Sequence, residues 1–233
     1  ACWLAYARVG EKNLPSYFRV NDSGWDNATF FAEGGPVISP DLPTFLILAC
    51  DALATLLEDD AARAAAWRPK ADALQAMLID RLWTGETFCA RLATDPERPL
   101  PGQNLIQFMP LLLGERLPRT MTDKLLARVD EGGFVTDWGP ATESPASPFY
   151  EDDGYWRGPI WAPTTLLLWD GLRRQGEKER AKAIAEKFCS LAAKNGMAEN
   201  FDARSGRGLR DRAFAWTSAA YLLLAASISQ DQP

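Results

Sequence analysis

The chain has 233 residues, of which 47% are hydrophobic and 24% are charged, a composition typical of a globular protein and not of a disordered one. Its 25 Lys and Arg against 31 Asp and Glu give a net charge of -6. Because no segment concentrates basic residues without acidic ones nearby, we expect no nucleic-acid partner and no anionic membrane partner. No apolar run reaches the ~20 residues that span a bilayer, and nothing resembles a secretory signal.

Histidine is absent from the sequence, which excludes Ser-His-Asp and Cys-His catalytic pairs and His-ligated zinc. Acid–base chemistry must therefore come from carboxylates, Lys or Tyr, and we expect neither a metal nor a cofactor. Cys2, Cys50, Cys89 and Cys189 show no CxxC spacing. They are typical of small buried side chains in a reducing compartment, so we predict a cytoplasmic protein. The nine Trp fit either a large core or stacking surfaces for sugar rings.

Helical periodicity dominates the sequence, and little of it alternates with period two, so the fold should be all-α. Some segments are apolar almost all round and predict inner helices, whereas others mix charged and apolar positions and predict outer helices. In chain order the inner helices are expected at 42–58, 103–113, 159–175 and 213–228, and the outer ones at 60–82, 119–131 and 177–195, with residues 2–9 ending a fourth. The centre of 83–102 could form a short strand pair.

Alternation of outer and inner helices predicts an α/α barrel, or toroid, in which two rings of helices are concentric. The loops that lead into inner helices, 10–41, 132–158 and 196–212, are long and rich in Gly, Pro, Trp and acids. The returning loops are short, so the long loops should share the functional end. Four inner and four outer helices are too few for a closed barrel of six hairpins. We expect residues 1–233 to be one partial barrel domain lacking two N-terminal hairpins; a naturally shorter, open arrangement is the alternative.

The first loop motif is SGWDNATFF, residues 23–31. The carboxyl group of Asp26 follows Trp25, whose ring could exclude water from it, as a general acid near neutral pH requires. The alternative is an Asp-Asn turn in which both side chains cap the local backbone.

The second motif is DDGYWRGPIW, residues 152–161. Gly158 permits an unusual turn, and Pro159 suits the first turn of a helix. Trp156, Arg157 and Trp161 offer two aromatic faces and a cation. The alternative is a packed helix start in which Arg157 pairs with Asp152 or Asp153.

The third motif is AENFDARSGRG followed by FAWTSA, residues 198–219. Glu199 precedes a Gly-containing loop and an inner helix; taken alone, it could be an ordinary solvated acid. All three motifs lie on the same kind of loop and should converge on one cavity. Two opposed carboxyl groups without metal ligands fit glycoside hydrolysis.

In this order, SGWDN, YWRGPIW, ENFDARSGRG and FAWTSAAYL resemble the signature segments of glycoside hydrolase family 63 and its trehalase relatives. The resemblance implies an (α/α)6 barrel, inversion of anomeric configuration and a small α-linked glucoside or related α-glycoside as substrate. It also implies that Asp26 is the general acid and Glu199 the general base. The positions that match pocket-lining residues of the family are Trp25, Trp156, Arg157, Trp161 and Trp216.

Two other classes of function remain open. A non-catalytic carbohydrate-binding fragment would keep the Trp residues without needing Asp26 or Glu199. An inverting glycoside phosphorylase would need only one carboxylic acid, since phosphate replaces water. Four arginines after Glu199, at positions 204, 207, 210 and 212, fit either an anionic aglycone or a solvated surface. A missing N-terminal segment or a second copy of the chain are the expected macromolecular partners.

Overall fold

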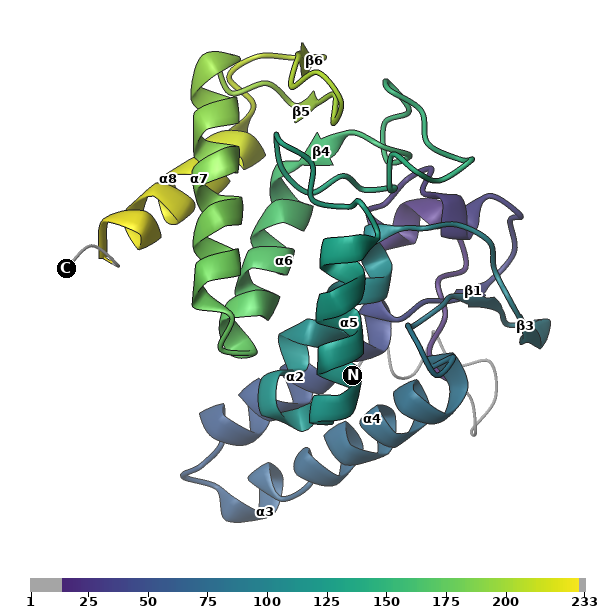
Figure 1. Ribbon diagram of the computed structural model, residues 1–233. Coiled ribbons are helices and arrows are strands. Elements are labelled where there is room, and N and C mark those ends of the chain that lie inside the picture. The colour runs from purple at the N-terminus through teal and green to yellow at the C-terminus, as the bar shows by residue number, and fades with distance from the viewer. Residues whose placement is uncertain (1–13, 231–233) are drawn as a thin grey trace. The chain divides into compact units, whose positions relative to one another are not determined.

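A computed structural model describes residues 14–230, so Cys2 and the helix expected to end at residue 9 lie outside the described residues. The described residues form two compact units (Figure 1). The first unit holds residues 14–26 and 30–101, and the second holds 27–29 and 102–230. The single domain expected over 1–233 stays a prediction.

The first unit is a helical hairpin with a small sheet. The antiparallel sheet has the order β1-β2-β3 and pairs Val37 with Leu92, and α2 packs against α4. Asp41, the first residue of α2, is completely buried and accepts hydrogen bonds from the Ser39 and Tyr17 hydroxyls. The elements are η1 (Val20–Ser23), β1 (Val37–Ile38), α2 (Asp41–Leu56), α3 (Ala61–Ala64), α4 (Arg68–Leu82), β2 (Arg91–Leu92) and β3 (Asp95–Pro99), and η2 (Thr29–Phe31) crosses the boundary between the units.

The second unit is a helical layer in which α6 packs against η3, α7 and α8. Its core joins apolar residues of α7 and α8 to those of the loop strands, including Ile160, Phe188 and Phe201. β4, β5 and β6 form a second antiparallel sheet at one end of α6 and α7 (Figure 1). The elements are η3 (Leu105–Arg116), α5 (Arg119–Glu131), β4 (Ile160–Trp161), α6 (Ala162–Arg174), α7 (Lys178–Lys194), β5 (Asn200–Phe201), β6 (Gly208–Leu209) and α8 (Ala215–Gln230).

Most expected helices are confirmed, but three differ from the expected segments, each near a proline. The segment 60–82 is two helices, α3 and α4, and Pro69 stands in the first turn of the second. Most of the segment 103–113 is part of the 3-10 helix η3, which contains Pro110 and is interrupted by a non-helical kink at Gly114. The helix expected from Pro159 begins at Ala162, with Pro163 in its first turn, because residues 160–161 pair as β4. Proline lacks the N–H that a helix interior needs.

The all-round burial expected for the inner helix at 213–228 is wrong for the described residues, and its place in an inner ring stays a prediction. The amphipathic helix α7 buries more of its residues than α8, whose buried positions form one stripe of Thr217, Ala220, Leu224 and Ser227. Trp216, Leu222 and Leu223 are more than half exposed. Uniform apolarity predicts a capacity for burial on every side, but contacts with α6 and α7 cover only one side of α8.

Other expectations concern the connections. The strand pair expected within 83–102 is confirmed as β2 and β3, and β1 extends it to a sheet. The returning loops before α3, α5 and α7 are short, as expected. None of the described helices combines the length and apolar character needed to cross a membrane. Cys50, Cys89 and Cys189 are free thiols, and cytoplasmic location stays a prediction.

Candidate active site

The β4–β5 pairing joins two of the sequence motifs in the second unit. Trp161 lies opposite Asn200, and Ile160 lies opposite Phe201. This register places Glu199, the residue before β5, at the end of the strand that pairs with the YWRGPIW motif. The loops 132–158 and 196–212 therefore share one end of this unit, as the pattern of long loops predicted (Figure 1).

An aromatic cluster follows from this pairing. Trp156 and Trp161 stack in parallel, with ring centroids 4.1 Å apart and 6° between the planes. The edge of Tyr155 meets Trp161 at 5.0 Å, and Trp216 at the start of α8 lies 6.3 Å from Trp161. Trp156 and Trp161 are buried, whereas Trp216 is 53% exposed. Within the described residues, Trp216 is the member of the cluster most open to a ligand.

Tyr155 holds an unusual backbone conformation in this cluster. Its φ is +63°, which is uncommon for a bulky residue and costs free energy that surrounding contacts must offset. Its carbonyl accepts a hydrogen bond from Trp161 Nε1 at 2.9 Å. The guanidinium of Arg210 lies over its ring, 4.9 Å from the centroid. The hydrogen bond from Trp161 and the cation–π contact with Arg210 thus both hold Tyr155 in the YWRG turn.

Asn27, which directly follows Asp26 in the chain, belongs to the second unit and binds the same turn. Its Nδ2 donates to Gly154 O and its Oδ1 accepts from the Trp156 backbone N–H, both at 2.9 Å. Its carbonyl accepts from Arg157 Nε at 2.8 Å. The local Asp-Asn turn considered for this motif is therefore not what the Asn27 side chain forms.

Arginines connect the two long loops. Arg210 pairs with Asp153 at 2.7 Å and donates to Asn200 Oδ1 at 3.0 Å. Arg204 lies 3.4 Å from Asp152, and its guanidinium covers the Tyr150 ring. Both loops gain rigidity from these contacts.

The phenol of Tyr150 lies between these two loops, under the guanidinium of Arg204. Burial, followed by the charges of Asp202 and Asp152, raises the pKa of Tyr150 to about 12. This phenol consequently stays protonated at neutral pH. Arg157, considered as a partner of Asp152 or Asp153, instead approaches Glu151 at 3.6 Å.

Glu199 is half-buried beside this network. Its backbone N–H donates to Asp211 O at 2.7 Å, which fixes the start of β5. Thr217 Oγ1 donates to Ala198 O at 2.7 Å and so fixes α8 to the same segment. Within the described part of the chain, the Glu199 carboxylate makes no hydrogen bond and no ion pair.

Asp26 and Trp25 lie in the first unit, in the turn between η1 and η2. Trp25 is buried at 4% exposure, and its backbone N–H donates to Ser23 Oγ at 3.0 Å. Asp26 is half-buried. Its carboxylate makes no hydrogen bond or ion pair with the described residues of its own unit. The convergence of Asp26 and Glu199 on one cavity stays a prediction.

Sequence reasoning missed Asn27, Tyr155 and Asn200 as parts of this site, and it left Arg210 open between binding an anionic aglycone and forming a solvated surface. Asn27 and Asn200 each directly follow an expected catalytic acid, which was the available signal. Tyr155 gave no such signal, because its positive φ and its contact with Arg210 arise only on folding. The residues described include no group of three His, Cys, Asp or Glu arranged for a metal ion.

Comparison with known proteins adds independent information. Residues 2–217 match the model of the mannosylglycerate hydrolase MGH1-like glycoside hydrolase domain. A mannosylglycerate hydrolase of Rubrobacter radiotolerans is 31% identical over 176 residues, which are 72% of this chain and 38% of that protein. A glucosylglycerate hydrolase of Mycolicibacterium hassiacum is 32% identical over 132 residues, which are 54% of this chain and 29% of that protein. The chain therefore spans less than half the length of these relatives.

Solved structures share the fold. A family 63 mannosylglycerate hydrolase of Thermus thermophilus, in complex with glucose, matches with a TM-score of 0.82 and 20% identity, over 97% of this chain and 66% of that one. Neutral trehalase from Saccharomyces cerevisiae matches with a TM-score of 0.63 and 18% identity, over 82% of this chain and 38% of that one. Together with the matched domain model, these similarities confirm the resemblance carried by the loop motifs: the chain belongs to the mannosylglycerate hydrolase MGH1-like group of glycoside hydrolase family 63.

Proposed function

We propose that this chain forms the catalytic part of an inverting glycoside hydrolase that cleaves a small α-glycoside. In this proposal Asp26 is the general acid that protonates the leaving oxygen, and Glu199 is the general base that activates water. Trp25, Trp156, Arg157, Trp161 and Trp216 line the substrate pocket. The described helices belong to one (α/α)6 barrel domain, a proposal supported by the fold shared with the Thermus enzyme and the trehalase.

The single observation that carries the proposal is the pairing of Trp161 with Asn200. It joins an aromatic cluster to a carboxylate, Glu199, that has no partner among the described residues. A structural acid would normally form a cap or an ion pair, as Asp153 does with Arg210. A carboxylate without a described partner, next to a strand that pairs with an aromatic motif, instead fits a sugar-cleaving site.

For the substrate, we favour an α-glycoside whose aglycone is a small acid such as glycerate. The support comes from relatives named as mannosylglycerate and glucosylglycerate hydrolases. Arg204 and Arg210 add little support, because each already faces an aspartate. α-Glucosylglycerate and α-mannosylglycerate are therefore the first substrates to compare, with a simple α-glucoside as the third.

The experiment follows the product anomer by proton NMR during the first minutes of hydrolysis by the purified protein. Inversion predicts that the β-anomer of the free sugar appears first and then mutarotates. First appearance of the α-anomer would contradict inversion. A sugar phosphate formed on addition of phosphate would indicate the phosphorylase, and tight binding without turnover would indicate the carbohydrate-binding alternative.

A crystal structure with bound sugar tests the geometry. Inversion requires room for a water molecule, so the two carboxyl groups should lie roughly 6.5–9.5 Å apart. A separation of about 5 Å would indicate retention. Carboxyl groups that point into different regions of solvent would contradict both mechanisms.

A further inference from the structure

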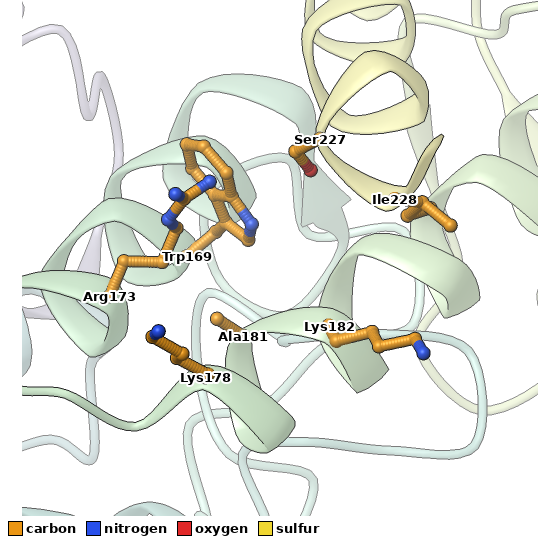
Figure 2. A pocket seen from close by; sticks show the side chains of 7 residues that line it. All are labelled: Trp169, Arg173, Lys178, Ala181, Lys182, Ser227 and Ile228. Atoms are coloured by element: carbon orange, nitrogen blue, oxygen red, sulfur yellow. The ribbon is translucent and has the colours of Figure 1, made fainter. Parts of the chain in front are cut away.

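A cavity lies in the second unit, between α6, α7 and α8 (Figure 2). It has a volume of about 60 Å³, whereas one water molecule needs only ~10–15 Å³ on the same measure. Its wall combines three cations with an indole, a hydroxyl and two apolar side chains. The lining residues are Trp169, Arg173, Lys178, Ala181, Lys182, Ser227 and Ile228.

The cavity is separate from the proposed active site. Its residues lie toward the C-terminal end of α6, the N-terminal half of α7 and the end of α8. The loops 132–158 and 196–212 and the strands β4–β6 instead meet the start of α6 and the end of α7 (Figure 1). None of the lining residues belongs to a motif that we assign to glycoside cleavage.

The three cations of this cavity are not neutralised. None of Arg173, Lys178 and Lys182 forms an ion pair with a residue that the structure describes. The neighbouring acids are already engaged: Asp170 pairs with Arg174 at 2.8 Å, and Glu177 pairs with Arg180. Glu179 is exposed on the first turn of α7 and has no described ion-pair partner. A local excess of positive charge therefore remains in a chain whose net charge is -6.

The position of the two lysines is unfavourable without a bound anion. Lys178 and Lys182 stand four residues apart on one helix face, where like charges repel. They also lie at the start of α7, where the helix dipole disfavours cations and favours anions. The side chain of Glu177, at the N-cap, makes no capping hydrogen bond. An anion in the cavity would offset both effects.

Arg173 is already held in place for such a ligand. Its guanidinium lies over the Trp169 ring, 4.9 Å from the centroid. This contact reduces the conformational freedom that an exposed arginine would otherwise lose on binding. Figure 2 shows Arg173 and Lys178 on one side of the cavity and Lys182 toward Ile228.

We propose that this cavity binds a phosphate-sized oxyanion, free or as the head group of a small organic phosphate, through Arg173, Lys178 and Lys182. The site is independent of the proposed hydrolase function and does not require a glycoside. Three donors of positive charge suit a dianion better than a single carboxylate, and the volume admits one tetrahedral group.

The test is isothermal titration calorimetry, in which the purified protein is titrated with inorganic phosphate and, separately, with glycerol phosphate. Saturable binding of either ligand supports the site. A comparison of the two affinities shows whether the free ion or the organic phosphate is preferred. The double variant Lys178→Gln/Lys182→Gln should weaken the affinity at least about tenfold, since each charged hydrogen bond contributes that much or more. Sodium chloride at matched ionic strength should not reproduce the heat of binding.

The matched control is Lys194→Gln, an exposed lysine at the other end of the same helix. It should leave the phosphate affinity unchanged. Thermal unfolding gives a second readout. Without phosphate, the melting temperature of the double variant should equal or exceed that of the wild type. Phosphate should raise the melting temperature of the wild type and of the control but not that of the double variant. Absence of saturation up to about 10 mM, or equal affinity in the double variant, would overturn the proposal.

Discussion

The side chain of Asn27 accepts a hydrogen bond from the backbone N–H of Trp156, 129 residues later in the chain, at 2.9 Å. Its amide returns a hydrogen bond to Gly154, and its carbonyl accepts one from Arg157. The residue after the proposed general acid is thus part of the turn that carries the aromatic cluster. Two motifs that are remote in sequence are joined by one asparagine.

Asn27→Ala removes both side-chain hydrogen bonds and leaves the Trp156 N–H without its partner. The free energy of unfolding should fall by about 1–3 kcal/mol, measured by urea denaturation. Asn27→Asp keeps the acceptor but loses the donor to Gly154, so its loss should be intermediate. The exposed Asn21→Ala is the control, and an equal effect of Asn21→Ala and Asn27→Ala would contradict the assigned role.

Asp26→Asn and Glu199→Gln test the catalytic assignment. Each should lower kcat by roughly 10²–10⁴ while sugar binding largely survives, because shape is kept and proton transfer is lost. A glycosyl fluoride needs little protonation of its leaving group, so it should partly restore turnover by Asp26→Asn and not by Glu199→Gln. Rescue in the opposite order would mean that the acid and the base are exchanged, and near-normal hydrolysis of the glycoside by either variant would exclude that residue.

Gly206→Ala tests how the loop after Glu199 packs. Gly206 has φ of +70°, and a Cβ there would overlap the Trp138 ring. Gly34 has φ of +72° with nothing within 4 Å of a Cβ, so Gly34→Ala reports the backbone cost alone. We expect Gly34→Ala to lower the free energy of unfolding by roughly 1 kcal/mol and Gly206→Ala by at least about 1 kcal/mol more. Equal losses would show that Trp138 moves aside freely.

The burial of the Asp41 carboxyl should make the free energy of unfolding depend on pH. Complete burial raises the pKa of its carboxyl, an effect that the hydrogen bonds from Ser39 and Tyr17 only partly oppose. The folded state therefore holds this proton more tightly than the unfolded state. The stabilisation is full below the ordinary aspartate pKa of about 3.9 and is lost as pH rises through the raised pKa.

Asp41→Asn should remove this dependence. The wild type should lose stability relative to Asp41→Asn as pH rises from about 4.5 to 8, measured by urea denaturation at each pH. The exposed Asp59→Asn provides the control, with a difference from wild type that stays flat. A difference for Asp41→Asn that is constant, or that grows in the opposite direction, would contradict the raised pKa.

Helix positions were largely predictable because periodicity is a local property of the chain. The boundaries of α5 at 119 and 131 agree with the expected segment, and α7 differs from it by one residue at each end. Local chemistry also predicted the turn at Gly158, whose φ is +150°. Pro69, Pro110 and Pro163 mark the places where expected helices break, change type or begin later.

The helical class, the family and the two carboxylates proposed for catalysis could all be predicted from the sequence, because each depends on the order and residue types of short segments. Three features could not be predicted in this way: Trp161 lies opposite Asn200, Tyr155 adopts a positive φ beneath Arg210, and α8 is buried along one stripe. These features depend on strand register and on which helix covers which face. Both follow from contacts between residues far apart in the chain, which no local pattern specifies.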